Sequence, residues 1–298
     1  MTTRSQPAPK RVLVTGASGA VGHATCTALV GRGHRVAGTM RNKGGKNADV
    51  ARSLEALGVR VVEMDVTVDA SVDAGVAATV EALGGLDVVF NNAGIGSYGV
   101  QELFSADEMR RVFDVNVFGV QRVMRAALPH LRAQGAGTVV YTSSLIGRVS
   151  IPFYGTYCGS KWALEAVAQA YRAELARFGI DSFIVEPGAL PTAFLDGMLQ
   201  PAAQDPAYAP EAALLGPSLD GLVQMLQANP AQRPERVATL VADLIDAPHG
   251  RRPFRVVVDQ TGMGEPIDRY NTHLAEVTRG LYTAFGNGEM LRLNADGT

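Results

Sequence analysis

The sequence predicts one α/β domain built on a doubly wound, mostly parallel sheet of seven strands. Short apolar runs alternate with longer helical patterns along most of the chain, which is typical of right-handed strand–helix–strand units. Most of the short runs are apolar at nearly every position, as expected for strands that are buried on both faces of a parallel sheet. The first run leads directly into a glycine-rich turn and then into a helical pattern, the order that this architecture requires.

The predicted strands and helices follow one another in order. Strands are expected at Val12–Thr15, Arg35–Thr39, Arg60–Met64, Leu86–Phe90, Thr138–Thr142, Asp181–Glu186 and Phe254–Val258. Helices are expected at about residues 20–32, 45–57, 69–83, 105–133, 156–178 and 234–246. No repeat with the spacing of a solenoid interrupts this alternation.

Two regions depart from the alternation and set the expected domain organisation. Residues 188–234 carry seven prolines and contain no stretch that fits a strand, so residues 189–234 are predicted to form a substrate lid or a disordered loop. Residues 265–298 form a tail with one helical stretch, Ile267–Phe285, which is either a surface helix or an arm that covers this site or a neighbouring subunit. Residues 1–10 are predicted to be a disordered leader, and residues 11–264 the main domain.

The composition excludes several classes of protein. The 27 basic and 29 acidic side chains give a net charge of −2, so no basic excess points to nucleic acid or to a membrane surface. No apolar run reaches the roughly 18 residues of a membrane span, and no signal peptide is recognised. Cys26 and Cys158 are the only cysteines, so we expect no disulfide framework and a reducing, cytoplasmic location. No metal site is predicted.

A glycine-rich loop joins the first predicted strand to the first helix. Backbone N–H groups in such a turn can approach a pyrophosphate where no Cβ intervenes, and the helix N-terminus adds about half a positive charge. This context is typical of the dinucleotide-binding Rossmann fold. The residues predicted to bind the dinucleotide are Gly16, Ser18, Gly19, Ala20, Val21 and Gly22.

The end of the second predicted strand favours NADP over NAD. An NAD site usually places Asp or Glu there to bind the ribose 2′-hydroxyl, but Met40 and Arg41 occupy this place. The guanidinium of Arg41 could pair with the 2′-phosphate of NADP. The alternative is that Arg41 is an ordinary solvated charge, which leaves NAD open.

Tyr157 and Lys161 stand four residues apart in a helical stretch, so their side chains are predicted to share one face. A phenol has a pKa near ~10, and a neighbouring ammonium group lowers it by roughly 1–3 units, toward the pH at which an acid/base catalyst works. Lys161 is the only lysine beyond residue 46, which suggests that an ammonium group is required there. The alternative is a surface pair without a role.

Ser144 and Asn116 are further candidate catalytic residues. Ser144 follows the strand predicted at Thr138–Thr142, and its hydroxyl could orient a substrate carbonyl and stabilise developing negative charge. Adjacent Ser143 competes for this role. Asn116 lies inside an apolar helical stretch, where Asn is unfavourable without a reason. It could hold a water that relays protons to Lys161, or it could be a polar group satisfied within the core.

Together these residues resemble the short-chain dehydrogenase/reductase family over roughly residues 11–260. The motifs stand in family order: Thr15-Gly16…Gly22, Asp65-Val66, Asn91-Asn92-Ala93-Gly94, Asn116, Ser144, Tyr157…Lys161, and Pro187-Gly188 with Thr192. The resemblance implies that Tyr157 is the acid/base and that Ser144 binds the reacting oxygen. It implies that Lys161 holds the nicotinamide ribose and lowers the pKa of the phenol, and that Asn116 completes a proton relay.

The resemblance also implies further cofactor contacts and an oligomer. Asp65 and Val66 would contact the adenine, and Asn92, Ala93 and Gly94 would line the cofactor. Pro187, Gly188 and Thr192 would face the nicotinamide end. Members of the family are commonly dimers or tetramers, so a homodimer or homotetramer is expected.

The glycine loop departs from the pattern of the family's single-domain branch. That branch spells the loop Thr-Gly-x-x-x-Gly-x-Gly, but here Ala20 replaces the middle glycine and Gly19 comes one place earlier. The observed spelling is typical of the extended branch of epimerases and dehydratases. The Asn-Asn-Ala-Gly segment and the short C-terminal region favour the single-domain branch.

The predicted function is hydride transfer between NADP(H) and a hydrophobic ketone or secondary alcohol. Substrate contacts are expected after Gly94, after Ser144 and in the insertion. The candidates, which could equally be core or lid packing, are Ile95, Tyr98, Leu145, Phe153, Tyr154, Phe194, Leu195 and Met198. The alternatives are an epimerase or dehydratase that keeps its nicotinamide bound, and a non-catalytic NADP-sensing protein.

Overall fold

The computed structural model describes residues 8–293 and has a seven-stranded sheet with helices on both faces. The strands are β1 (Arg11–Thr15), β2 (Arg35–Met40), β3 (Arg60–Glu63), β4 (Val88–Asn91), β5 (Gly137–Thr142), β6 (Ile180–Pro187) and β7 (Arg255–Val258). Their order is β3-β2-β1-β4-β5-β6-β7, and every neighbouring pair is parallel. The order of winding reverses between β1 and β4, where the carboxyl ends of the strands form the crevice in which such sheets bind ligands.

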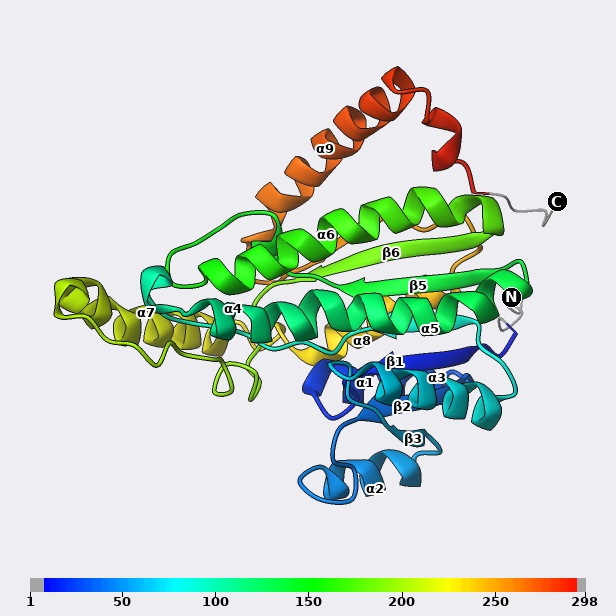
Figure 1. Ribbon diagram of the computed structural model, residues 1–298, viewed down its shortest axis with the longest axis horizontal. Helices are drawn as coiled ribbons and strands as arrows, with labels where there is room; N and C mark the ends of the chain where they lie inside the picture. The colour runs from blue at the N-terminus through cyan, green and yellow to red at the C-terminus, as the bar shows by residue number, and fades with distance from the viewer. Residues whose placement is uncertain (1–7, 294–298) are drawn as a thin grey trace.

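The helices form two layers around this sheet. They are α1 (Ala20–Gly31), α2 (Ala48–Ala56), α3 (Asp69–Leu83), α4 (Ala106–Phe113), α5 (Gly119–Ala133), α6 (Gly155–Leu175), α7 (Ala209–Gln227), α8 (Pro234–Asp246) and α9 (Gly264–Ala284). Helices α1, α2 and α8 supply one core cluster, and α3, α5 and α6 supply the other. Figure 1 shows α5 and α6 lying along β5 and β6.

Strand β1 shows why apolar and polar residues do not alternate along the strands. Val12 and Val14 are fully buried in the core that contains α1 and α8. Leu13, between them, is fully buried in the opposite core that contains α5 and α6. Since both faces of the sheet are covered, every position of a central strand must be apolar.

The predicted helix at 105–133 is in fact broken. Helix α4 begins at a capping box in which Ser105 and Glu108 satisfy each other's backbone N–H groups, and it ends at Phe113. A π-helical turn, Asp114–Phe118, separates it from α5. This turn contains Asn116, so the break falls at a candidate catalytic residue.

The insertion contains a helix that its prolines concealed. Residues 188–234 hold no strand, only a single bridge between Ser97 and Leu199, but they include the 19-residue helix α7. Pro210 lies in the first turn of α7, where no N–H is needed, and Pro217 lies in its interior. Figure 1 shows α7 reaching past the end of the sheet beside α4.

The tail forms helix α9, which begins three residues earlier than the predicted Ile267–Phe285 and ends one residue earlier. In Figure 1 its first turns lie near the sheet and its last turns point away from it. No helix within residues 8–293 is long and apolar enough to cross a membrane. Residues 1–7 and 294–298, which belong to the predicted leader and tail, lie outside the described residues.

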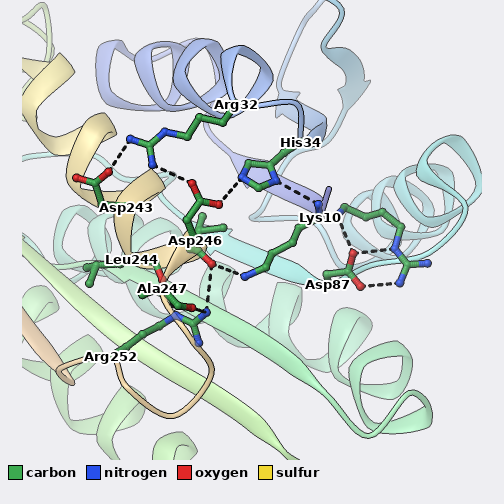
Figure 2. A network of polar contacts seen from close by, with 11 residues as sticks. Lys10, Arg32, His34, Asp87, Asp243, Leu244, Asp246, Ala247 and Arg252 are labelled. Atoms are coloured by element: carbon green, nitrogen blue, oxygen red, sulfur yellow. Dashed lines mark hydrogen bonds and ion pairs between the residues drawn. The ribbon is translucent and has the colours of Figure 1, made fainter. Parts of the chain in front are cut away.

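A polar network closes the opposite end of the sheet, at the amino ends of the strands (Figure 2). The last carbonyl groups of α8 have no hydrogen-bond donor within the helix. Two cationic side chains donate to them instead. Lys10 Nζ donates to Ile245 O, and the Arg252 guanidinium donates to Leu244 O and Ala247 O. The network therefore holds Lys10, which the sequence assigned to the leader. It lies away from the carboxyl ends of the strands and stabilises the fold.

Candidate active site

The glycine loop contains two glycines that packing requires and one that it does not. Gly16 has a φ of +67°, and a Cβ there would lie 2.8 Å from Ala93 Cα. A Cβ on Gly22 would lie 2.4 Å from Gly16 O. Gly19 is exposed, and its Cβ would meet only Gly16 O at an ordinary 3.5 Å. Packing within the protein therefore does not require glycine at position 19. Close approach of a ligand can be the reason for it.

The first turn of α1 provides donors beside Gly19. Its N–H groups at Ala20, Val21 and Gly22 have no acceptor within the helix. Ala20 is exposed and Ser18 is half-buried. The N–H groups lie beside the end of β1, and their chemistry fits the dinucleotide pyrophosphate that the sequence predicts here.

Asn92 ties the end of β4 to the glycine loop. Its backbone N–H donates to Thr15 Oγ1 at 2.9 Å, and its side chain donates to Thr15 O at 2.9 Å. Ala93 N also donates to Thr15 Oγ1, at 3.0 Å. The Asn92 amide is therefore used to hold the loop. Beyond it, a Cβ on Gly94 would lie 3.6 Å from Lys161 Nζ, so this segment runs from the loop to helix α6.

Arg41 and Asp65 lie together beside the far end of the crevice. Arg41 follows β2, its side chain is 62% exposed, and its Nη1 lies 3.8 Å from Asp65 Oδ2. Burial opposes the charge on Asp65, but hydrogen bonds from Thr67 and the nearby Arg41 outweigh it and lower the pKa of the carboxyl. Val66 beside it is buried. Asp65 is thus ionised and fixed in orientation.

Tyr157, Ser144 and Lys161 meet where β5 and β6 end. Tyr157 is 9% exposed, and Ser144 is close enough to its hydroxyl to favour the ionised form of the phenol. Lys161 Nζ lies 5.7 Å from the centre of the Tyr157 ring and donates to Thr142 O at 2.8 Å. Ser143 does not take part: its hydroxyl is buried and makes no hydrogen bond to any described residue. The structure brings together the three groups predicted from spacing.

Burial acts on the pKa values of both the Tyr157 phenol and the Lys161 ammonium group. Burial raises the pKa of Tyr157 well above its usual value, and the hydrogen bond with Ser144 opposes this rise. Burial lowers the pKa of Lys161 to about 8, while Glu165, one turn along α6, acts in the other direction. Desolvation disfavours both charged forms, so it acts against the lowering of the phenol's pKa that the sequence predicts.

The side chain of Asn116 clamps two segments. Its Oδ1 accepts from Ile95 N at 2.9 Å, and its Nδ2 donates to Ile95 O and to Ser160 Oγ, both at 2.9 Å. Both amide hydrogens are thus used. A water that relays protons would therefore receive no hydrogen bond from the Asn116 amide and could only donate one to Oδ1.

Pro187, Gly188 and Thr192 mark the exit of the chain from the sheet. Pro187 O lies 3.5 Å from Ser144 Oγ. A Cβ on Gly188 would lie 2.3 Å from Asp259 Oδ1 and 2.9 Å from Gln232 Nε2, so a side chain there would displace these two side-chain ends. The Thr192 hydroxyl accepts from Phe194 N at 3.4 Å and so begins the turn that brings the insertion back toward Tyr157.

The insertion packs over the Tyr157 ring. The ring centres of Phe194 and Tyr157 lie 5.9 Å apart, edge to face. Met198 and Phe194 both press on Gly96, where a Cβ would lie 2.7 Å from Met198 Cγ. The sequence reasoning missed Gly96, and only this packing identifies it. Leu195 is half-buried in the same turn.

A second group of predicted substrate residues forms an aromatic cluster. The Tyr98 ring lies 4.8 Å from Tyr154 and 6.0 Å from Phe153, centre to centre. The Tyr98 hydroxyl donates to Leu215 O of α7 at 2.8 Å. Phe153 has a φ of +69°, a strained conformation for a bulky residue. Leu145 is buried and Ile95 half-buried.

Comparison with known proteins supports one family throughout. The family model described as short chain dehydrogenase matches residues 10–202. A 3-ketodihydrosphingosine reductase of Bacteroides thetaiotaomicron is 35% identical over 189 residues, which cover 63% of this chain and 66% of that protein. Human retinol dehydrogenase 8 is 35% identical over 192 residues, which cover 63% of this chain and 61% of that protein. The chain thus spans less than two thirds of the length of these two relatives.

Solved structures match over most of the chain. A short-chain dehydrogenase from Streptomyces avermitilis is 32% identical with a TM-score of 0.72, over 94% of this chain and 99% of that one. An alcohol dehydrogenase from Thermococcus sibiricus, complexed with 5-hydroxy-NADP, is 26% identical with a TM-score of 0.65, over 84% and 95% of the chains. A Burkholderia phymatum enzyme in complex with NAD is 26% identical with a TM-score of 0.73, over 93% and 96%. Given this fold, these motifs and these matches, the chain belongs to the short-chain dehydrogenase/reductase family and is an oxidoreductase.

Proposed function

We propose that this oxidoreductase uses NADP(H) and acts on a hydrophobic ketone or secondary alcohol. The observation that carries the proposal is the buried contact of Tyr157 with Ser144, next to Lys161. A nicotinamide cofactor supplies the hydride when it is bound. The residues that would hold it are the glycine loop at its pyrophosphate and Asp65 at its adenine, with Gly94 and Lys161 toward the nicotinamide ribose.

The path of the proton follows from the geometry of the three side chains. With a ketone as substrate, the Tyr157 hydroxyl gives its proton to the carbonyl oxygen, and the Ser144 hydroxyl donates a hydrogen bond to the same oxygen. The phenolate that remains is stabilised by the ammonium group of Lys161, 5.7 Å from the ring. Burial favours the neutral phenol, so Tyr157 holds its proton until the substrate oxygen receives it. Asn116 keeps Ile95 and Ser160 in place around this site.

The choice of NADP rests on the surroundings of Arg41. Its exposed guanidinium has one long ion pair, to Asp65 at 3.8 Å, and retains donors for a 2′-phosphate. Glu63 is the carboxylate next to this loop, but its two oxygens accept N–H bonds from Asn42 and Lys43. It is therefore poorly placed to bind a ribose hydroxyl. The solved relatives include one complex with 5-hydroxy-NADP and one with NAD.

The proposed substrate class rests on the walls beside Tyr157. The side chains that the insertion brings there, Phe194 and Met198, are apolar, and residues 189–234 would act as the lid. The names of two relatives, a 3-ketodihydrosphingosine reductase and a retinol dehydrogenase, accord with hydrophobic ketones and alcohols. We further propose a cytoplasmic homodimer or homotetramer, which agrees with two free, buried cysteines and with the assembly common in the family.

The test is the rate of NADPH oxidation, with NADH in parallel, across a panel of hydrophobic ketones. Turnover that favours NADPH, and that falls by about 10²–10⁴-fold in Tyr157→Phe, is the expected result. Tight binding of NADPH without turnover of any ketone, or of the matching alcohols with NADP, would instead favour an epimerase or a cofactor sensor. Equal use of NADH would contradict the role given to Arg41.

A further inference from the structure

A buried cluster of charged and amide groups joins helix α9 to helix α6, which carries Tyr157 and Lys161. Its members come from five segments: Arg148 from the turn after β5, Glu165 from α6, Glu186 from β6, Arg255 from β7 and Asn271 from α9. All five side chains are buried. A set of charges this deep must be paired within the protein, because water cannot reach it.

The contacts run through the whole cluster. Arg255 Nε lies 2.8 Å from Glu165 Oε2, and Arg148 Nη1 lies 3.5 Å from the same oxygen. Arg148 Nε donates to Asn271 Oδ1 at 3.1 Å, and Asn271 Nδ2 donates to Glu186 Oε2. The amide of Asn271 therefore bridges the cation of one segment and the carboxyl of another.

Glu165 and Glu186 are the two carboxyl groups of the cluster. Glu165 Oε2 lies 2.8 Å from Arg255 Nε, and Glu186 Oε1 lies 3.7 Å from the same nitrogen. Oε1 of each is buried, and neither oxygen receives a hydrogen bond from any other residue of the described part of the chain. Because two neighbouring buried carboxylates repel each other, we expect this pair to take up one proton more readily than an isolated carboxyl group. Burial and the neighbouring Glu165 together raise the pKa of Glu186 to about 8.

Three members lie within a few residues of proposed site residues in the chain. Arg148 lies four residues after Ser144, Glu165 one helical turn after Lys161, and Glu186 directly before Pro187, whose carbonyl lies 3.5 Å from Ser144 Oγ. The cluster thus fixes the relative positions of three segments: the Ser144 turn, helix α6 and the end of β6.

We propose that Asn271 is a positioning residue of the active site, which holds Ser144 against Tyr157 through Arg148 and Glu186. This inference rests on the proposed role of Tyr157 and Ser144 as the proton-donating pair. It gives the C-terminal helix α9 a role in catalysis without contact with the substrate.

The cluster also makes this role dependent on pH. The other titratable groups that face it include Lys161 and Arg172 on α6 and Tyr270 on α9. The Arg148 guanidinium lies over the rings of Tyr270 and Trp162, at 5.1 and 5.6 Å from their centres. The two rings therefore hold the Arg148 guanidinium in place. The carboxyl pair is the part of the cluster that takes up or releases a proton.

The experiment compares Asn271→Leu and Asn271→Asp with Thr272→Val, a matched control at the exposed neighbouring position on α9. Leucine keeps the shape of Asn271 but removes both hydrogen bonds. We expect kcat to fall by about 10- to 100-fold in Asn271→Leu, because small displacements of reacting groups have effects of this size. Cofactor affinity should fall much less than kcat, since the proposed pyrophosphate and 2′-phosphate contacts at Gly19 and Arg41 lie outside the cluster. Thr272→Val should behave as wild type.

The variant Asn271→Asp separates positioning from a purely structural role. While the introduced carboxyl group is protonated, it can accept from Arg148 and donate to Glu186, whereas its ionised form repels Glu186. The kcat of this variant should therefore recover toward the wild-type value as pH falls and be lost as pH rises, while Asn271→Leu stays low throughout. Equal kcat in wild type and Asn271→Leu, with only a lower Tm in the variant, would overturn the inference.

Two readouts need no substrate. In protein labelled with ¹³C-tyrosine, the Tyr157 signal, assigned by its loss in Tyr157→Phe, should shift in Asn271→Leu and not in Thr272→Val. Infrared spectra should contain the band of a protonated carboxyl group at neutral pH, and Glu186→Gln should remove it. An unmoved Tyr157 signal or a missing carboxyl band refutes the inference. If the wild type turns over no ketone or alcohol, the proposed function fails, and these two readouts still decide the role of Asn271.

Discussion

Alanine substitutions at Gly19 and Gly22 are expected to separate cofactor binding from the stability of the fold. The two glycines lie three residues apart in one loop, and the same methyl group is added at each. At Gly22 the new Cβ would lie 2.4 Å from Gly16 O and 2.9 Å from both Ala17 Cα and Asn92 Nδ2. At Gly19 it would meet only Gly16 O, at 3.5 Å.

The contact distances give the expected magnitudes. Backbone atoms cannot move aside as a flexible side chain does, so Gly22→Ala should cost about 1–3 kcal/mol of unfolding free energy. For a domain of this size that lowers Tm by about 2–10 °C. Gly19 has a φ of −79° and a ψ of 156°, which alanine adopts freely. Gly19→Ala should therefore leave Tm unchanged or raise it slightly, by reducing the entropy of the unfolded chain.

Cofactor affinity should respond in the opposite sense at Gly19. Its exposed position beside the free N–H groups of α1 is where the pyrophosphate would approach most closely. We expect the Kd of NADPH to rise by about 10- to 100-fold in Gly19→Ala, which corresponds to about 1.4–2.8 kcal/mol. Thermal unfolding without cofactor and fluorescence titration with NADPH measure the two effects. Wild-type affinity in Gly19→Ala, or wild-type Tm in Gly22→Ala, would refute this interpretation of the loop.

Other substitutions test the remaining groups of the site. Arg41→Ala should weaken NADPH binding by about tenfold or more and NADH binding hardly at all, because a charge-assisted hydrogen bond contributes about 1.5–3 kcal/mol; an equal loss for both cofactors in the same titration would contradict this. Lys161 has a pKa of about 8 in the folded protein, lowered by burial from 10.5. Between these pH values the unfolded chain binds more protons than the folded one. The unfolding free energy of the wild type should therefore rise with pH by up to about 3 kcal/mol. Denaturant unfolding of Lys161→Met should lack this rise, and parallel pH curves for the two proteins would speak against it. Phe194→Ala should raise KM for a hydrophobic ketone by about tenfold with little change in kcat, since the ring contributes apolar contact area beside Tyr157; a loss confined to kcat would assign Phe194 a different role.

The sheet could be predicted because its strands carry their burial in the sequence. All seven strands occur at the predicted places, with edges that differ by a few residues: the strand expected at Leu86–Phe90 is Val88–Asn91. The signal is strong since a strand covered on both faces is apolar at every position, as Val12, Leu13 and Val14 are. Helix boundaries that depend on contacts with residues far away in the chain leave no comparable pattern in the sequence.

The break at Asn116 is an example of a boundary set by tertiary contacts. A periodicity analysis joins residues 105–133 into one helix, because the apolar pattern continues through the turn. The side chain of Asn116 instead bonds Ile95, 21 residues earlier, and Ser160, 44 residues later. These long-range hydrogen bonds accompany a π-helical turn that no local pattern encodes. Helix α7 escaped prediction for a different reason, since prolines that normally end a helix lie at its start and in its interior.

The candidate site divides in the same way between local and distant information. Tyr157 and Lys161 could be paired from sequence because their spacing alone places them on one helix face. Ser144 could not be separated from Ser143, because the choice depends on which hydroxyl faces Tyr157 across the fold. The pKa of Tyr157 depends on packing for a related reason: sequence identifies a nearby cation, but only the packed structure gives the desolvation that acts against it. Residue types therefore predict which chemistry is available, and the burial of each group determines the protonation state from which that chemistry starts.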